Sequence, residues 1–168
     1  MVQTDVTYTA GVRNVTFRDI FLEKNRVGFA FVFCHNRFSR SYYPGATVPL
    51  QEQFVLENVR VLHEHAVPVL SIGTPVDAVT IAHSTFRNST IRVNGDPEVH
   101  DHGETNLNLI GCTFRHPGPM TLLENRVPGK HIRLQTRGSL VLCSDFSAAV
   151  EAGGGKVNVE SDLPEMKR

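Results

Sequence analysis

Apolar residues recur with one spacing in four segments of the chain. Apolar side chains occupy positions i and i+2, and apolar or small side chains return at i+5 and i+7. The segments are 15–22 (VTFRDIFL), 54–61 (FVLENVRV), 79–86 (VTIAHSTF) and 107–114 (LNLIGCTF). A continuous strand would place the second pair at i+4 and i+6. We therefore predict two short strands in each segment, joined by a two-residue bend that keeps both apolar pairs inside.

The residue at the second bend position supports this prediction. It is Asp19, Asn58, His83 or Gly111, and these residue types leave the β region and adopt positive φ more readily than most. A third apolar stretch follows each segment, at 28–33, 67–73, 90–95 and 120–125. Each repeating unit is therefore expected to contain three short strands.

The units begin at Val15, Phe54, Val79 and Leu107, with spacings of 39, 25 and 28 residues, and a weaker unit begins at Ile132. The pattern predicts an all-β fold, a right-handed single-stranded parallel β-helix of about four to five coils. An antiparallel sandwich is the alternative, but it does not explain one bend repeated four times. In the β-helix the second apolar residue of each unit stacks on the next: Phe17, Leu56, Ile81 and Leu109.

The expected organisation is a β-helix over 1–146, with an insertion loop at 34–53, and a C-terminal cap and tail over 147–168. The pattern loses its register from Leu140. Before Val15, residues 6–9 supply at most one covering strand, so apolar side chains of the first coil should face water: Phe17, Ile20, Phe29 and Phe31. Such an end favours truncation from a longer solenoid, with self-association or an N-terminal β-helical portion covering the first coil.

Composition narrows the possible partners. Lys+Arg and Asp+Glu both number 17, which argues against nucleic acid or a membrane surface as a partner held by bulk charge. Arg outnumbers Lys 13 to 4, which favours planar contacts to carboxylates. Three cysteines (Cys34, Cys112 and Cys143) lack metal-site spacing and are expected to be small buried side chains. No cofactor is indicated. Residues 1–10 have no signal-peptide pattern.

Residues 10–143 resemble the pectin-lyase-like β-helix superfamily, and most closely the later coils of polygalacturonase-type glycoside hydrolases. The resemblance is carried by VRNVTFRDIFLEKNRVGFAFVF, FVLENVRVLHEHAVPVLSIG and VTIAHSTFRN. It implies a polysaccharide as partner, an anionic pectic polymer being the candidate. It also implies an extracellular or periplasmic location if the chain belongs to a polysaccharide-degrading enzyme.

The catalytic motifs of that family (N-T-D, D-D, G-H-G and R-I-K) are not reproduced, so the catalytic residues remain unknown and the isolated chain is expected to be inactive. Inverting hydrolysis needs two carboxylates facing each other across the glycosidic bond. The strand 70–73 resembles the one that follows G-H-G, but 66–68 replace the motif itself. Residues 91–94 resemble R-I-K with Asn94 in place of Lys. The missing acids favour a strand role for 91–94, and Arg92 is kept as a candidate substrate-binding residue.

The insertion supplies the other candidate binding residues: Arg37, Arg40, Tyr42 and Tyr43. Arg suits bidentate contact with a uronate, and Tyr suits stacking on a sugar ring. The alternative is a surface loop that closes over the coil wall.

Two other segments, 96–104 and 63–65, contain residue types that bind metals, but a solvated loop or turn is the favoured interpretation of each. His100, Asp101 and His102 are weak candidates in the loop 96–104, which otherwise reads as a solvated acidic loop. The segment 63–65 (HEH) has no identifiable third ligand. Two functions therefore stay open: the C-terminal portion of a pectin-active glycoside hydrolase whose acids lie elsewhere, or a non-enzymatic module for stacking, adhesion or assembly.

Overall fold

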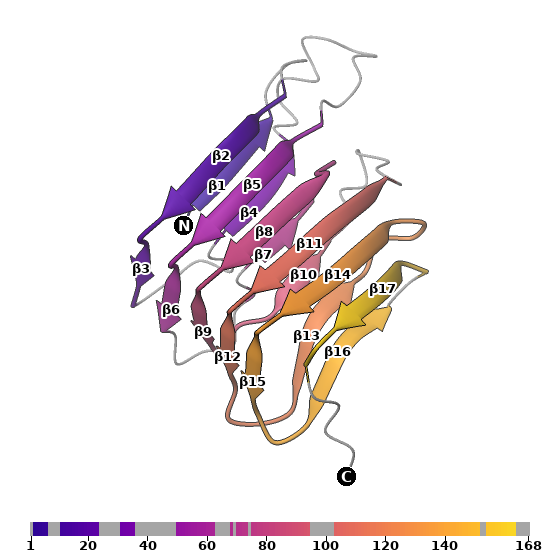
Figure 1. Cartoon of the computed structure of the whole chain (residues 1–168). Helices are drawn as coiled ribbons and strands as arrows, with labels where there is room; N and C mark the ends of the chain where they lie inside the picture. The colour runs from indigo at the N-terminus through magenta and orange to yellow at the C-terminus, as the bar shows by residue number, and fades with distance from the viewer. Residues whose placement is uncertain are drawn as a thin grey trace.

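The computed structural model contains only β-strands among the residues it describes, which are 2–6, 11–23, 31–35, 50–62, 68, 70–73, 75–94, 103–151 and 154–163. The strands form three parallel sheets, and each strand pairs with strands of the adjacent coils, on both sides except for the terminal strands of each sheet. Figure 1 shows two sheets as opposed layers whose strands run in opposite directions, with a shorter third sheet at one end. The prediction of an all-β parallel β-helix is confirmed.

The sheets are defined by their strands in stacking order. Sheet A contains β1 (Val2–Val6), β4 (Phe31–His35), β7 (Leu70–Ile72), β10 (Ile91–Val93), β13 (Met120–Asn125) and β16 (Phe146–Glu151). Sheet B contains β2 (Arg13–Arg18), β5 (Glu52–Glu57), β8 (Ala78–Ala82), β11 (Glu104–Ile110), β14 (His131–Arg137) and β17 (Lys156–Ser161). Sheet C contains β3 (Phe21–Leu22), β6 (Arg60–Leu62), β9 (Thr85–Arg87), β12 (Thr113–Arg115) and β15 (Leu140–Leu142).

The predicted bends join sheet B to sheet C. The second bend residue has positive φ in every predicted unit, and Gly138 continues the series in the following coil. The angles are 58° at Asp19, 50° at Asn58, 50° at His83, 60° at Gly111 and 59° at Gly138. Each left-handed residue turns the chain without reversing its faces, so the apolar residues before and after the bend both point inward.

The core consists of columns of like residues along the solenoid axis. In sheet B the pairs Phe17–Leu56, Leu56–Ile81 and Ile81–Leu109 are direct register partners, as predicted. Leu56, Ile81 and Leu109 are each 0% exposed. In sheet C, Phe86 and Phe114 stack with ring centroids 5.0 Å apart. The repeat is therefore a packing unit as well as a sequence pattern.

Three expectations about the chain ends need correction. The register continues beyond Leu140, because β15, β16 and β17 pair with β12, β13 and β14. A covering strand is β1, which overlaps the expected segment 6–9 only at Val6; residues 7–9 lie outside the described residues. Because β1 pairs with β4, Phe31 is only 2% exposed instead of facing water. Phe29 lies outside the described residues.

The cysteines agree in part with their expected role. Cys112 is a buried free thiol whose Sγ donates to the carbonyl oxygen of Ile81 at 3.2 Å, and burial raises its pKa. Cys143 is also free but is partly exposed, which corrects the expectation of burial. The side chain of Cys34 lies outside the described residues.

Replacing Leu56 with Ala should lower the free energy of unfolding by about 2–5 kcal/mol. The substitution opens a cavity between two stacked neighbours that are held by their own strands. Chemical denaturation measures the change, and Val55→Ala on the outward side of the same strand is the control. A loss no greater than that of the control would contradict the stacked core.

Candidate functional site

A row of polar residues crosses the outer face of sheet A. Ile91 and Val93 of β10 are 0% and 1% exposed, so Arg92 between them points outward. Its register partners are Ser71 on β7 and Glu124 on β13. These residues are far apart in the sequence, and the stacking of coils brings them into one row.

Glu124 lies between two guanidinium groups. One Glu124 carboxylate oxygen is 3.2 Å from Nε of Arg92, and the other is 2.7 Å from Nε of Arg126. The hydrogen bond from Arg126 lowers the pKa of Glu124 most; partial burial opposes it, and the charges of both arginines lower it further. The carboxylate is therefore held ionised, and the three side chains together carry one net positive charge.

Neutral hydrogen-bonding groups adjoin these charges. The Asn94 side-chain amide donates to Oγ of Ser71 at 2.7 Å, and its backbone N–H donates to the carbonyl oxygen of Ile72. Ser71 is almost fully buried, whereas 47% of the Arg126 side chain is exposed. We call Ser71, Arg92, Asn94, Glu124 and Arg126 the arginine cluster. It offers guanidinium and amide groups on a rigid surface.

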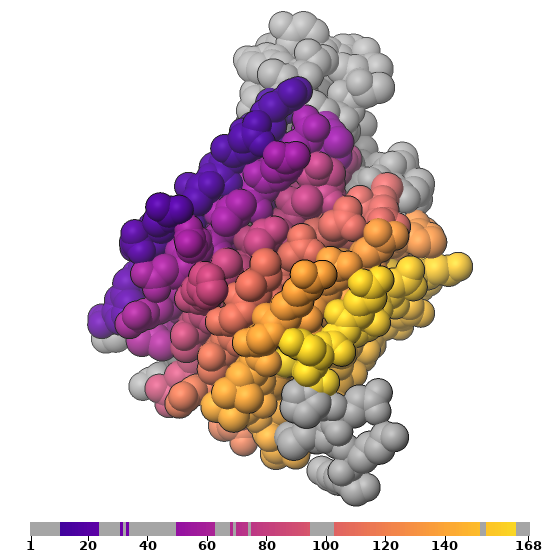
Figure 2. All heavy atoms as spheres, in the orientation of Figure 1, coloured from indigo at the N-terminus to yellow at the C-terminus, as the bar shows by residue number. Residues whose placement is uncertain are grey.

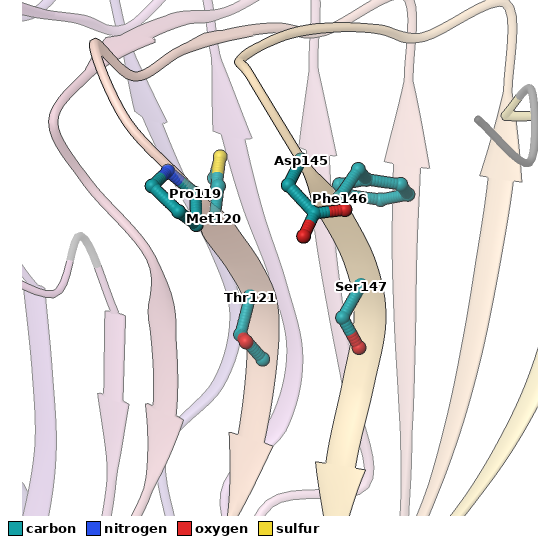
Figure 3. Close-up of a pocket in the computed structure, with 6 residues that line it drawn as sticks. All are labelled: Pro119, Met120, Thr121, Asp145, Phe146 and Ser147. Atoms are coloured by element: carbon teal, nitrogen blue, oxygen red, sulfur yellow. The ribbon is translucent and has the colours of Figure 1, made fainter. Parts of the chain in front are cut away.

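A shallow hollow of about 180 Å³ lies where β13 and β16 begin. Thr121 and Ser147 are register partners on these strands, and Figure 3 shows them side by side. In the same view the Asp145 side chain lies between the two strand starts. The hollow also contacts Met120 and Phe146. Hydroxyls, a carboxylate and apolar surface thus meet in the sheet that also carries the arginine cluster.

The structure places only part of the predicted site. Arg92 lies in the arginine cluster, but Arg37, Arg40, Tyr42 and Tyr43 lie outside the described residues. The weak metal candidates His100, Asp101 and His102 also lie outside them, as does the segment 63–65. Glu104, from the end of the acidic loop, belongs to β11 and pairs with Arg133 at 3.3 Å.

Sequence reasoning missed Glu124, Arg126 and Ser71 as members of a site. The sequence pattern did not place them, because matching the apolar pair 91/93 with 120/122 sets Arg92 beside Thr121, whereas the observed register sets it beside Glu124. Opposite charges at neighbouring register positions are a recognisable pair in a sheet.

Comparisons with protein-family models, curated proteins and solved structures found no match to this chain. In the described part of the chain, no group of three or more His, Cys, Asp or Glu side chains could hold a metal ion. The same residues include no helix long and apolar enough to cross a membrane. The side chains on the outer face of sheet A are therefore the basis for inferring a function.

The ionised state of Glu124 should stabilise the protein in a pH-dependent manner. Because its pKa is lowered in the folded state, the stabilisation is full above the unfolded-state pKa of about 4.3 and is lost as the pH falls through the folded pKa. Glu124→Gln should therefore reduce the free energy of unfolding at neutral pH and cost less in acid. Equal costs at both pH values, or an unshifted Glu124 in an NMR titration, would contradict this.

Proposed function

We propose that this chain binds an anionic polysaccharide along the outer face of sheet A, as part of a polysaccharide-active parallel β-helix. The observation that carries the proposal is the sharing of one carboxylate, Glu124, by Arg92 and Arg126. Two guanidinium groups carry more positive charge than one carboxylate neutralises, and they have more N–H donors than one carboxylate can bind. The cluster therefore retains donors for a ligand carboxylate.

The shape of the surface favours a polymer over a small anion. The accessible part of the row, Arg92 and Glu124, crosses two strands about 4.8 Å apart, and the buried Ser71 on the third strand holds Asn94 beside them. The hollow at Thr121 and Ser147 extends the polar surface toward the next strand. A linear chain with repeated carboxylates can contact several of these groups together. A pectic polymer rich in galacturonate has this chemistry.

The same cluster does not supply the general acid that hydrolysis requires. A general acid in glycoside cleavage must carry a proton near neutral pH. Glu124 is held ionised by two arginines, so it is unsuited to donate one. In a glycoside hydrolase of the pectin-active type, the catalytic acids would lie on coils other than those of the arginine cluster. The insertion residues Arg37, Arg40, Tyr42 and Tyr43 remain further candidates for contact with the polymer.

Arg92→Ala and Arg126→Ala should each weaken binding to polygalacturonate about ten-fold, equivalent to about 1.4 kcal/mol. Each change removes a donor and leaves Glu124 less neutralised, so the surface becomes less attractive to an anion. Calorimetric titration measures the affinity, which should also fall with added salt because screening acts beyond about 8 Å.

Arg133→Ala is the matched control, because Arg133 also pairs with a glutamate but lies on sheet B. It should leave the affinity unchanged. Equal weakening by all three substitutions would indicate a general charge effect, and no weakening by Arg92→Ala or Arg126→Ala would overturn the proposed surface.

The isolated chain should release no reducing ends from polygalacturonate while still binding it. A reducing-sugar assay on the polymer tests this. Asp96, Asp101 and Glu104 are carboxylates of the loop 96–104 that could serve as acid or base. If release occurs and is abolished by Asp96→Asn, Asp101→Asn or Glu104→Gln, the catalytic groups lie on this chain and the binding-only assignment is wrong. Absence of both binding and release would favour the alternative, a non-enzymatic module for stacking, adhesion or assembly.

A further inference from the structure

Strands β9 and β12 of sheet C have the same sequence, TFR, and lie in register on neighbouring coils (Figure 1). The register partners are Thr85–Thr113, Phe86–Phe114 and Arg87–Arg115. Both phenylalanines are buried, and their rings stack with centroids 5.0 Å apart. Because successive side chains of a strand point to opposite faces, the threonines and the arginines point outward. The buried stack therefore holds two identical outward pairs side by side.

In the described part of sheet C, the two arginines have no acidic neighbour at an outward position. Leu62 is the register partner of Arg87 on one side, and Leu142 is that of Arg115 on the other. The outward positions of β6, β9, β12 and β15 are Arg60, Leu62, Thr85, Arg87, Thr113, Arg115, Leu140 and Leu142. Arg87 and Arg115 are exposed, and neither forms an ion pair with another described residue. The outer face of these strands therefore carries two adjacent positive charges that no described carboxylate neutralises.

Arginines on the other two sheets are arranged differently. Three outward arginines there have a glutamate as register partner on the neighbouring strand, with N–O distances of 3.4 Å (Arg13–Glu52), 2.7 Å (Arg18–Glu57) and 3.2 Å (Arg92–Glu124). Figure 2 shows the coils packed against one another as successive bands, and neighbouring strands lie about 4.8 Å apart. Like charges at such positions destabilise a sheet. An anion bound between Arg87 and Arg115 offsets this repulsion.

We propose that Arg87 and Arg115 together bind a phosphate monoester on the outer face of sheet C. Each guanidinium group presents several N–H donors, and a phosphate monoester has strong acceptor oxygens and a charge of about −1.5 to −2 near neutral pH. One phosphate can therefore match both positive charges and accept hydrogen bonds from both groups. A carboxylate matches only one of these charges. Thr85 and Thr113, on the same outward face, add hydroxyl groups beside the arginines.

Exposed apolar surface beside the arginines favours an ester over inorganic phosphate. Leu140 and Leu142 on β15 are 45% and 41% exposed, and Leu142 is the register partner of Arg115. The organic part of an ester can cover these leucines while its phosphate contacts the arginines, whereas inorganic phosphate leaves them in water. The site lies on sheet C and the arginine cluster on sheet A, so this binding does not depend on the function proposed above.

An NMR titration of the full chain with phenyl phosphate tests the proposal. The Nε–Hε signals of Arg87 and Arg115 should shift saturably. Arg87→Ala and Arg115→Ala should each raise the dissociation constant about ten-fold or more, because a charge-assisted contact is lost. Phenyl sulfate has a smaller negative charge, and inorganic phosphate has no organic part to cover the leucines, so both should bind several-fold more weakly. Both arginines are exposed, so the variants are expected to fold.

Arg18→Ala is the matched control. Arg18 is also an outward arginine, but its Nη2 lies 2.7 Å from the Glu57 carboxylate on sheet B. Its loss changes the net charge equally and should leave the affinity for phenyl phosphate unchanged. Absence of saturable binding, or equal weakening by Arg18→Ala, would overturn the proposed site. Phenyl sulfate binding as tightly as phenyl phosphate would overturn the assignment of a phosphate, and equally tight binding of inorganic phosphate would overturn the assignment of an ester.

Discussion

The fold depends on a left-handed residue at each corner between sheets B and C. Without it, the apolar pair after the corner would point away from the pair before it, and a coil would have no continuous inner surface. For residues other than glycine this conformation costs about 1–2 kcal/mol. Asp19, Asn58 and His83 nevertheless adopt it. The corner N–H bonds to the next coil offset part of that cost, so each corner stabilises its neighbour.

Burial of the apolar side chains in this protein depends on the stack of coils rather than on any single coil. Each coil presents two open faces, and only a coil above and a coil below remove both from water. Phe54 and Leu56 have such neighbours and are buried, whereas Val15 and Phe17 have one neighbour and are not. At the last corner no further coil follows, so the N–H of Gly138 donates to the Asp162 carboxylate, and Leu163 packs against the core.

The candidate site follows from the same stacking. Arg92 and Glu124 are 32 residues apart in the chain, yet the register places them on neighbouring strands. Arg126 joins them from the segment that follows β13 and takes the other carboxylate oxygen. The outward side chains of neighbouring coils thus set the charge of this surface, and the buried side chains beneath them fix its geometry.

The sequence by itself determined the corners and the inward columns, because a corner needs particular residue types and a buried column needs apolar ones. Both requirements repeat along the sequence, so the repeat identified the corner residues Asp19, Asn58 and His83 and the stack that begins at Phe17. Outward positions carry no such periodic requirement, so the sequence identified Arg92 without its partners Glu124 and Arg126. The unit at Ile132 was weak in the sequence, and the strands after Leu140 were missed, for a related reason: Thr136 and Ser161 occupy inward positions where earlier coils have Leu56, Ile81 and Leu109. Only the tertiary structure decided these features, because backbone pairing with the preceding coil holds a strand in register even where its side chains are polar.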